Sequence, residues 1–154
     1  MQLIQRALRE QHGDVLVFLP GAREIRRVQA GLAAGEGVSV LPLFGDLTVE
    51  QQDAALAPAA PGTRKVVLAT NIAETSLTLP GVRVVVDSGL ARRALFDPVT
   101  GMSRLATERI SRASADQRQG RAGRIEAGVC YRAWSAGAPS LPTNAPHRGT
   151  RRSR

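Results

Sequence analysis

Four arginines, two glutamines and two glycines are concentrated in the fourteen residues 111–124, S-R-A-S-A-D-Q-R-Q-G-R-A-G-R. Ser114, followed three residues later by Gln117, forms a capping-box pattern that predicts a helix beginning at Ser114 and running toward Arg124. On such a helix Gln117, Arg121 and Arg124 share one face, because they stand at i, i+4 and i+7. A planar guanidinium binds phosphate oxygens through paired hydrogen bonds, so this face could hold a polyphosphate.

The glycines of this stretch strengthen the case for a ligand. Gly120 and Gly123 expose backbone beside the same face, and glycine costs about 1 kcal/mol relative to alanine inside a helix. Close approach of a ligand or of a second backbone would explain both. The alternative is a solvated basic helix. In either case Arg118 falls on the opposite side from Arg121, and we expect substitution of Arg118 to be tolerated.

A second cluster of polar side chains occupies the stretch 69–78, A-T-N-I-A-E-T-S-L-T. It directly follows the clearest strand of the sequence, 64–70. An open α/β sheet binds its ligands beyond the carboxyl ends of its strands, so these side chains could face one. A capped helical turn that uses its hydroxyls locally is an equal alternative.

The elements that must position these clusters alternate along the chain. Apolar runs predict strands at 15–19, 38–43, 64–70, 82–86 and 128–134. Helical spacing predicts helices at 1–11 and 22–34, and a third from Thr48, capped with Gln51, to near Pro58. This alternation predicts an α/β fold with a parallel sheet flanked by helices. With 43% hydrophobic but only 3% aromatic residues, its core should be aliphatic.

A β-hairpin is expected late in the chain. Segments 92–97 and 102–110 are joined by D-P-V-T-G, which is typical of a turn between antiparallel strands. Its arginines could form a wedge against duplex nucleic acid, or the hairpin could be a solvated structural flap.

The net charge of +8 lies entirely after residue 91, which favours binding of a polyanion by the second half of the chain. The last segment, 135–154, contains prolines, glycines and arginines without apolar periodicity, and we expect it to be a disordered basic tail. Cys130 stands alone, and two histidines give no metal-ligand spacing. No apolar run approaches the length of a membrane span, which predicts a soluble, cytoplasmic protein.

The order of residues in Q-R-Q-G-R-A-G-R resembles the last helicase motif of DEAH-box RNA helicases. Three further stretches are similar to that family: V-F-L-P-G, A-T-N-I-A-E-T-S-L-T and V-D-S-G-L-A-R-R. Together with F-D-P-V-T-G-M-S-R-L, they most resemble the HrpB-type bacterial branch. The resemblance covers 1–134 and implies a RecA-like domain, the second of two motor domains.

The resemblance also implies roles for individual residues. Gln117, Arg121 and Arg124 would meet the γ-phosphate of ATP, with Arg124 as the arginine finger. The nucleotide would further be approached by Ser76, Thr78 and Gly120. Nucleic acid would be contacted by Thr70, Asn71, the backbone at Gly21, where a helix start can bind phosphate, and the hairpin residues Arg92 and Arg93.

Two motifs needed for ATP hydrolysis are missing from this sequence, a glycine-rich loop ending in Lys-Ser/Thr and a D-E-A-H segment. ATP with Mg²⁺ would therefore be bound mainly by an N-terminal RecA-like domain, and the chain alone should be inactive. Single-stranded or structured RNA is the expected substrate, with DNA possible. The alternatives are a non-catalytic nucleic-acid-binding module and, less favoured without a phosphate loop, another phosphoryl-transfer enzyme.

Overall fold

The computed structural model describes residues 1–75, 77, 79–122, 128–134 and 151–152. Its helices are α1 (Gln2–Glu10), α2 (Ala22–Gly31), α3 (Val49–Leu56), the short 3₁₀ helix η1 (Asn71–Ala73) and α4 (Arg112–Gln119). Its strands are β1 (Asp14–Phe18), β2 (Val38–Leu43), β3 (Arg64–Ala69), β4 (Val82–Asp87), β5 (Leu90–Asp97), β6 (Met102–Arg109), β7 (Val129–Arg132) and β8 (Arg151–Arg152).

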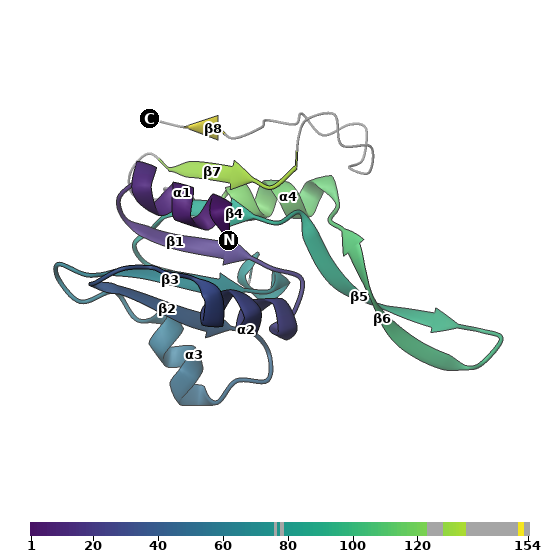
Figure 1. Cartoon of the computed structure of the whole chain (residues 1–154). Coiled ribbons are helices and arrows are strands. Elements are labelled where there is room, and N and C mark those ends of the chain that lie inside the picture. Colours follow the sequence, from purple (N-terminus) through teal and green to yellow (C-terminus); the bar gives the residue numbers. More distant parts are fainter. Residues whose placement is uncertain (76, 78, 123–127, 135–150, 153–154) are drawn as a thin grey trace.

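The central sheet has the strand order β2-β3-β1-β4-β7-β8 (Figure 1). Pairing is parallel from β2 to β7, and β8 joins β7 in the antiparallel direction. The predicted α/β fold with a parallel sheet is confirmed, consistent with the RecA-like architecture. Of the tail expected to be disordered, the structure describes only Arg151–Arg152, which lie in β8, and the rest of 135–154 is outside the described residues.

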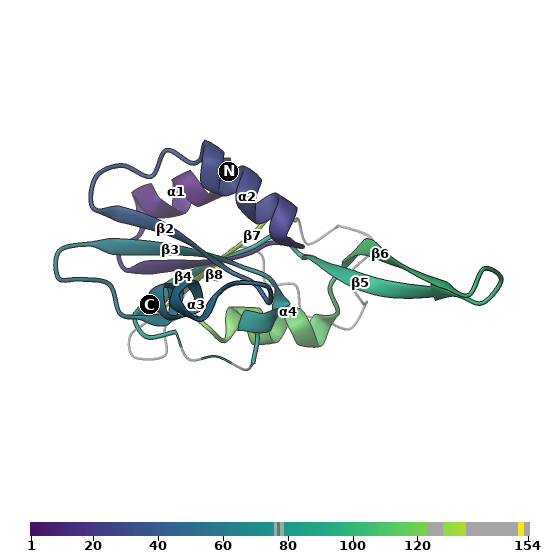
Figure 2. The ribbon, with the colours of Figure 1, turned by 90° about the horizontal axis from the view of Figure 1, so that it is seen from below.

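Helices cover both faces of this sheet. Figure 2 shows α1 and α2 on one side and α3 and α4 on the other. The strand residues alternate between the two faces, so that Val15 and Val17 pack under α1 and α2 while Leu16 and Phe18 face the opposite layer. Both cores consist mainly of valine, leucine, isoleucine and alanine, as the aromatic-poor composition predicts. No described helix combines the length and apolar character needed to cross a membrane.

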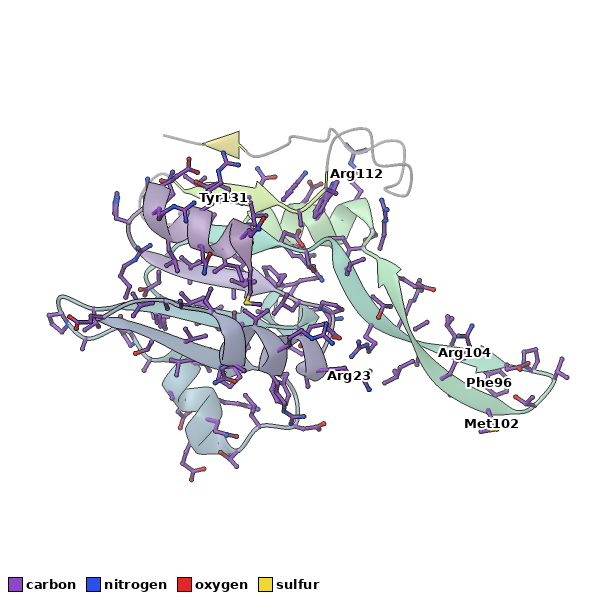
Figure 3. All side chains as sticks on the ribbon, viewed as in Figure 1. Arg23, Phe96, Met102, Arg104, Arg112 and Tyr131 are labelled. Atoms are coloured by element: carbon purple, nitrogen blue, oxygen red, sulfur yellow. The ribbon has the colours of Figure 1, made fainter. Side chains whose placement is uncertain are left out.

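The predicted hairpin is also confirmed. Strands β5 and β6 pair in the antiparallel direction over their full length and extend away from the sheet (Figure 1). The turn is held by Asp97, whose backbone oxygen accepts from Gly101 N at 2.8 Å and whose carboxylate accepts from Val99 N at 2.9 Å. Gly101 has a φ of +70°, a conformation that favours glycine. Figure 3 shows Phe96, Met102 and Arg104 on this projecting arm.

Helix α3 is closed at both ends by hydrogen bonds. Thr48 Oγ1 accepts from Gln51 N at 3.2 Å, and Gln51 Oε1 accepts from Thr48 N at 3.1 Å, which is the predicted capping box. At the other end Lys65 Nζ donates to the carbonyl oxygens of Ala55 and Ala57. These bonds make the Lys65 side chain a buried cap for the last carbonyls of the helix, although burial lowers the pKa of Lys65.

Candidate functional site

One edge of the sheet gathers most of the polar residues singled out above. Because β1, β3 and β4 are parallel neighbours, their carboxyl ends meet there. The turn at Gly21 follows β1, the stretch 70–77 follows β3, and Asp87 ends β4. Helix α4 lies beside this edge. This is the position at which open α/β sheets bind ligands.

The limits of α4 differ from the prediction. The helix begins at Arg112 rather than Ser114, because Ser111 is the N-cap and its hydroxyl accepts from Ser114 N at 3.1 Å. It ends at Gln119, with Gly120 as C-cap. Arg121 therefore lies after the helix, and the expected continuous face from Gln117 to Arg124 does not form within the described residues.

Substitution of Arg118 was expected to be tolerated because Arg118 would lie opposite Arg121, but Arg118 and Arg121 both bind Glu74 in the loop after β3. The effect of the substitution itself stays a prediction. The Arg118 side chain is fully buried. Its Nε donates to Glu74 Oε1 at 2.8 Å and its Nη1 to Asp87 Oδ1 at 2.8 Å. Both terminal nitrogens also donate to Leu90 O at 3.2 Å. The guanidinium carbon lies 4.7 Å from the centroid of the Phe18 ring. Four segments of the chain thus converge on one arginine.

The carboxylate of Asp87 is the most buried acid at this edge, with no solvent exposure. Burial raises the pKa of Asp87, while the charge of Arg118 and a hydrogen bond from Gly89 N oppose that rise. The Gly89 bond measures 2.8 Å to Oδ1, and Oδ2 has no hydrogen-bond partner within the part of the chain that the structure describes. Arg118 is therefore the principal stabiliser of this charge.

Arg121 is also turned toward the protein. Only 8% of its surface is exposed. Its Nε donates to Glu74 O at 2.7 Å and its Nη1 to Leu77 O at 2.7 Å. The side chain thus holds the loop after β3 by its backbone. Its predicted contact with a γ-phosphate stays a prediction.

The other residues predicted to meet the nucleotide divide into two groups. Gln117 and Gly120 are exposed at the end of α4, where an amide and an open backbone can meet a ligand. Ser76, Thr78 and Arg124 lie outside the described residues, so their predicted roles are untested.

The residues predicted to contact nucleic acid after β3 lie at the start of η1. Thr70 is the N-cap of η1, but its side chain makes no capping hydrogen bond. A capping role therefore does not account for a hydroxyl at this position. Asn71 is exposed. Both side chains are placed to meet a ligand at the sheet edge, and their predicted roles remain predictions.

Gly21 and Arg92, far apart in sequence, are brought together by the fold. Gly21 is the N-cap of α2, and a Cβ added there would overlap the Arg92 guanidinium. Arg92 in turn forms an ion pair with Glu24 in the first turn of α2. Arg93 is separate from them: it is exposed on the hairpin and lies 3.4 Å from Glu108. At this point of the site, the N-terminus of α2 therefore lies against the Arg92 guanidinium, which is paired with Glu24.

Sequence reasoning missed the buried network of Arg118, Glu74 and Asp87. One signal was available: Ala115 and Arg118 stand at i and i+3, so an apolar residue marks the face on which Arg118 lies. Among the described residues, no group of three or more histidine, cysteine or acidic side chains is arranged to hold a metal ion.

Comparison with known proteins gives consistent matches. A family model described as the helicase conserved C-terminal domain matches residues 1–126. The ATP-dependent RNA helicase HrpB of Escherichia coli (strain K12) is 56% identical over 124 residues, which cover 79% of this chain and 15% of that protein. The pre-mRNA-splicing factor ATP-dependent RNA helicase prp22 of Schizosaccharomyces pombe is 46% identical over 158 residues, covering 95% of this chain and 13% of that protein.

Solved structures give the same result. The crystal structure of the E. coli DExH-box NTPase HrpB has a TM-score of 0.79 and 53% sequence identity, over 84% of this chain and 16% of that one. The crystal structure of the Escherichia coli DEAH/RHA helicase HrpB has a TM-score of 0.80 at the same identity. The chain spans well under a fifth of the length of these relatives.

Proposed function

Because this chain belongs to the family of helicase conserved C-terminal domains, we propose that it serves as the C-terminal motor domain of an ATP-dependent RNA helicase. The observation that carries the proposal is the similarity to ATP-dependent RNA helicases along most of the chain. The arrangement of α4 against the loop after β3 supports it, since donors for phosphate and nucleic acid then share one edge of the sheet.

The donors at this edge fit phosphate groups. Gln117 offers an exposed amide, Gly120 an exposed backbone, and Arg121 lies directly beyond them. Within the described segments no cluster of acids could hold Mg²⁺. Because the sequence contains neither a glycine-rich loop ending in Lys-Ser/Thr nor a D-E-A-H segment, we place ATP and Mg²⁺ mainly on an N-terminal RecA-like domain of the same protein, with the γ-phosphate turned toward α4.

In this arrangement ATP supplies the phosphoryl group, and the chain supplies positive charge to it. Arg124 acts as the arginine finger, stabilising the charge that develops on the γ-phosphate in the transition state. Gln117 orients the attacking water or the phosphate by hydrogen bonding. Arg121 holds the loop 74–77 in register with the nucleotide and reaches the phosphate when the two domains close.

RNA is held by its backbone at the other end of the same edge. The N-terminus of α2 at Gly21 offers backbone N–H groups, and the Arg92 guanidinium, which pairs with Glu24, lies beside it. Thr70 and Asn71 contribute hydrogen bonds from the loop after β3, and Arg93 lies on the hairpin. Contacts of this kind ignore base identity, so binding should be sequence-tolerant and weaken steeply with salt.

The experiment that tests this proposal joins the chain to the N-terminal part of the E. coli relative and measures RNA-stimulated ATP hydrolysis. We expect Arg124→Ala to lower kcat by about 10³–10⁵, equivalent to roughly 4–7 kcal/mol, because an arginine finger acts in the transition state. Arg121→Ala should also raise KM for ATP. Arg27→Ala, an exposed arginine on α2, is the matched control and should leave hydrolysis unchanged.

The same experiment separates the proposal from its alternative. If the joined protein binds RNA with the same affinity whether or not ATP is present, and hydrolyses none, the chain is a non-catalytic nucleic-acid-binding module. Normal hydrolysis by Arg124→Ala would exclude the finger while leaving the family assignment intact.

A further inference from the structure

The guanidinium of Arg118 connects the loop after β3 to the base of the β5–β6 hairpin. On the loop side it binds Glu74, and on the hairpin side it binds Leu90, the first residue of β5. Asp87 lies between them and completes the set. These two segments are otherwise on different elements, one beside α4 and the other leading into the projecting arm (Figure 1).

The hairpin base is built around the same carboxylate. Asp87 Oδ1 accepts from Arg118 and also from Gly89 N, each at 2.8 Å. The returning strand closes on this turn, because Ile110 N donates to Gly89 O at 2.9 Å. Both strands of the arm therefore leave the body at residues that the Arg118–Asp87 pair fixes.

The guanidinium transmits position because it is planar and rigid. Its N–H groups point in fixed directions, so moving one bonded partner tilts the plane and strains the bonds to the others. The pair with Asp87 is fully buried, whereas the Glu74 side chain is 12% exposed and lies next to a single turn of 3₁₀ helix. The Glu74 bond is thus the one that can break while the network stays folded.

We propose that Arg118 is a positioning residue that couples the loop 70–75 to the direction of the β5–β6 hairpin. The role of this coupling rests on the proposed function, since the loop faces nucleotide and nucleic acid only if the chain is a helicase motor domain. When closure of the domains displaces the loop, the hydrogen bond between Arg118 and Glu74 breaks or shifts. The guanidinium then reorients, and the carbonyl of Leu90 that it binds moves with it. The arm then moves with the state of the loop.

The test uses the chain itself and requires no helicase activity. Amide hydrogen exchange is measured residue by residue on the parent chain, on Glu74→Ala and on Glu108→Ala. The control removes the same kind of charge from the exposed pair with Arg93 on the arm. Global unfolding free energies of all three are measured in denaturant, so that exchange through complete unfolding can be subtracted.

We expect Glu74→Ala to accelerate amide exchange at Gly89 and Ile110 by about tenfold. This factor corresponds to the free energy of one hydrogen bond to a charged group. Glu74→Gln should restore most of the protection, because its amide oxygen still accepts from Arg118. Glu108→Ala should not affect Gly89 or Ile110. Acceleration confined to 71–75 would overturn the proposal, because the loop would then be uncoupled from the arm.

Uniform acceleration across the chain, including amides of the distant helix α1, would also overturn it, since the network would then serve global stability alone. Because none of these readouts involves ATP or RNA, failure of the coupling and failure of the helicase assignment are distinguished by different experiments.

Discussion

Replacing Arg118 with alanine should be among the most destabilising changes in this protein. The substitution removes both the cation and four hydrogen bonds from a position without solvent exposure. It leaves the Asp87 carboxylate buried, with the Gly89 amide as its remaining hydrogen-bond donor and Arg132 as a remaining nearby cation among the described residues. Breaking a buried pair by removing one partner costs about 3–5 kcal/mol, and we expect a loss of unfolding free energy in that range.

The cost should depend on pH in a defined direction. Burial places the folded pKa of Asp87 above its ordinary value of 3.8. Between those two values the unfolded chain binds fewer protons than the folded chain, so stability falls as pH rises through that window. Removing Arg118 raises the folded pKa further and widens the window. The difference in unfolding free energy between parent and Arg118→Ala should therefore shrink as pH is lowered from about 7 toward 4.

Equilibrium denaturation followed by far-UV circular dichroism measures these quantities. Asp87→Asn and the double variant Arg118→Ala/Asp87→Asn complete a double-mutant cycle. The double variant should be less destabilised than the sum of the single changes, because it leaves no uncompensated buried carboxylate at position 87. Arg27→Ala, on the exposed face of α2, should change stability by less than about 0.5 kcal/mol. A cost for Arg118→Ala below about 1 kcal/mol, or strict additivity in the cycle, would refute the reasoning.

Three further predictions concern other parts of the chain. The isolated chain should hydrolyse no ATP in a phosphate-release assay, with or without RNA, because its sequence lacks a phosphate loop and a D-E-A-H segment. ATP hydrolysis by the purified chain would contradict this. Burial raises the pKa of Cys130 from 9.0 to about 12, so as pH rises above 9 the thiol ionises in the unfolded chain before it does in the folded chain. This difference should lower the unfolding free energy by about 1.4 kcal/mol at pH 10. Denaturation of Cys130→Ala at pH 8 and pH 10 should show no such loss from this group. Thr48→Ala should cost about 1 kcal/mol of unfolding free energy by removing the cap of α3, as measured by equilibrium denaturation; an unchanged free energy would contradict this.

The elements were predictable because their signals are local. Buried parallel strands show as continuous aliphatic runs, and Thr48 and Gln51 specify the start of α3 through neighbours three residues apart. The start of α4 was misplaced because Ser111 and Ser114 are both acceptable N-caps, and the choice depends on where β6 ends. That limit is set by pairing of Leu90 with Arg109 across the hairpin, which the sequence of 111–124 alone does not contain.

The burial of Arg118 and Arg121 was not predictable from residue type, because arginine is rarely buried unless it is paired. Their partners come from distant parts of the chain: Glu74 and Leu77 follow β3, and Asp87 ends β4. A helical pattern reports which residues share a face but not which acids the fold brings to that face. The prediction that substitution of Arg118 is tolerated did not allow for these partners, and the structure now favours the opposite outcome.

The inward arginines also bear on why the motif contains several of them. A lysine at position 118 would offer three donors from one point, whereas the guanidinium reaches Glu74, Asp87 and Leu90 along separate directions. Arg121 uses the same geometry to bind two carbonyls of the loop. Two arginines of Q-R-Q-G-R-A-G-R thus hold the loop and the hairpin base in place. A ligand contact at Arg124 would depend on that scaffold, and we therefore expect Arg118→Lys to impair ATP turnover in the joined protein even where its thermal unfolding shows that the fold is retained.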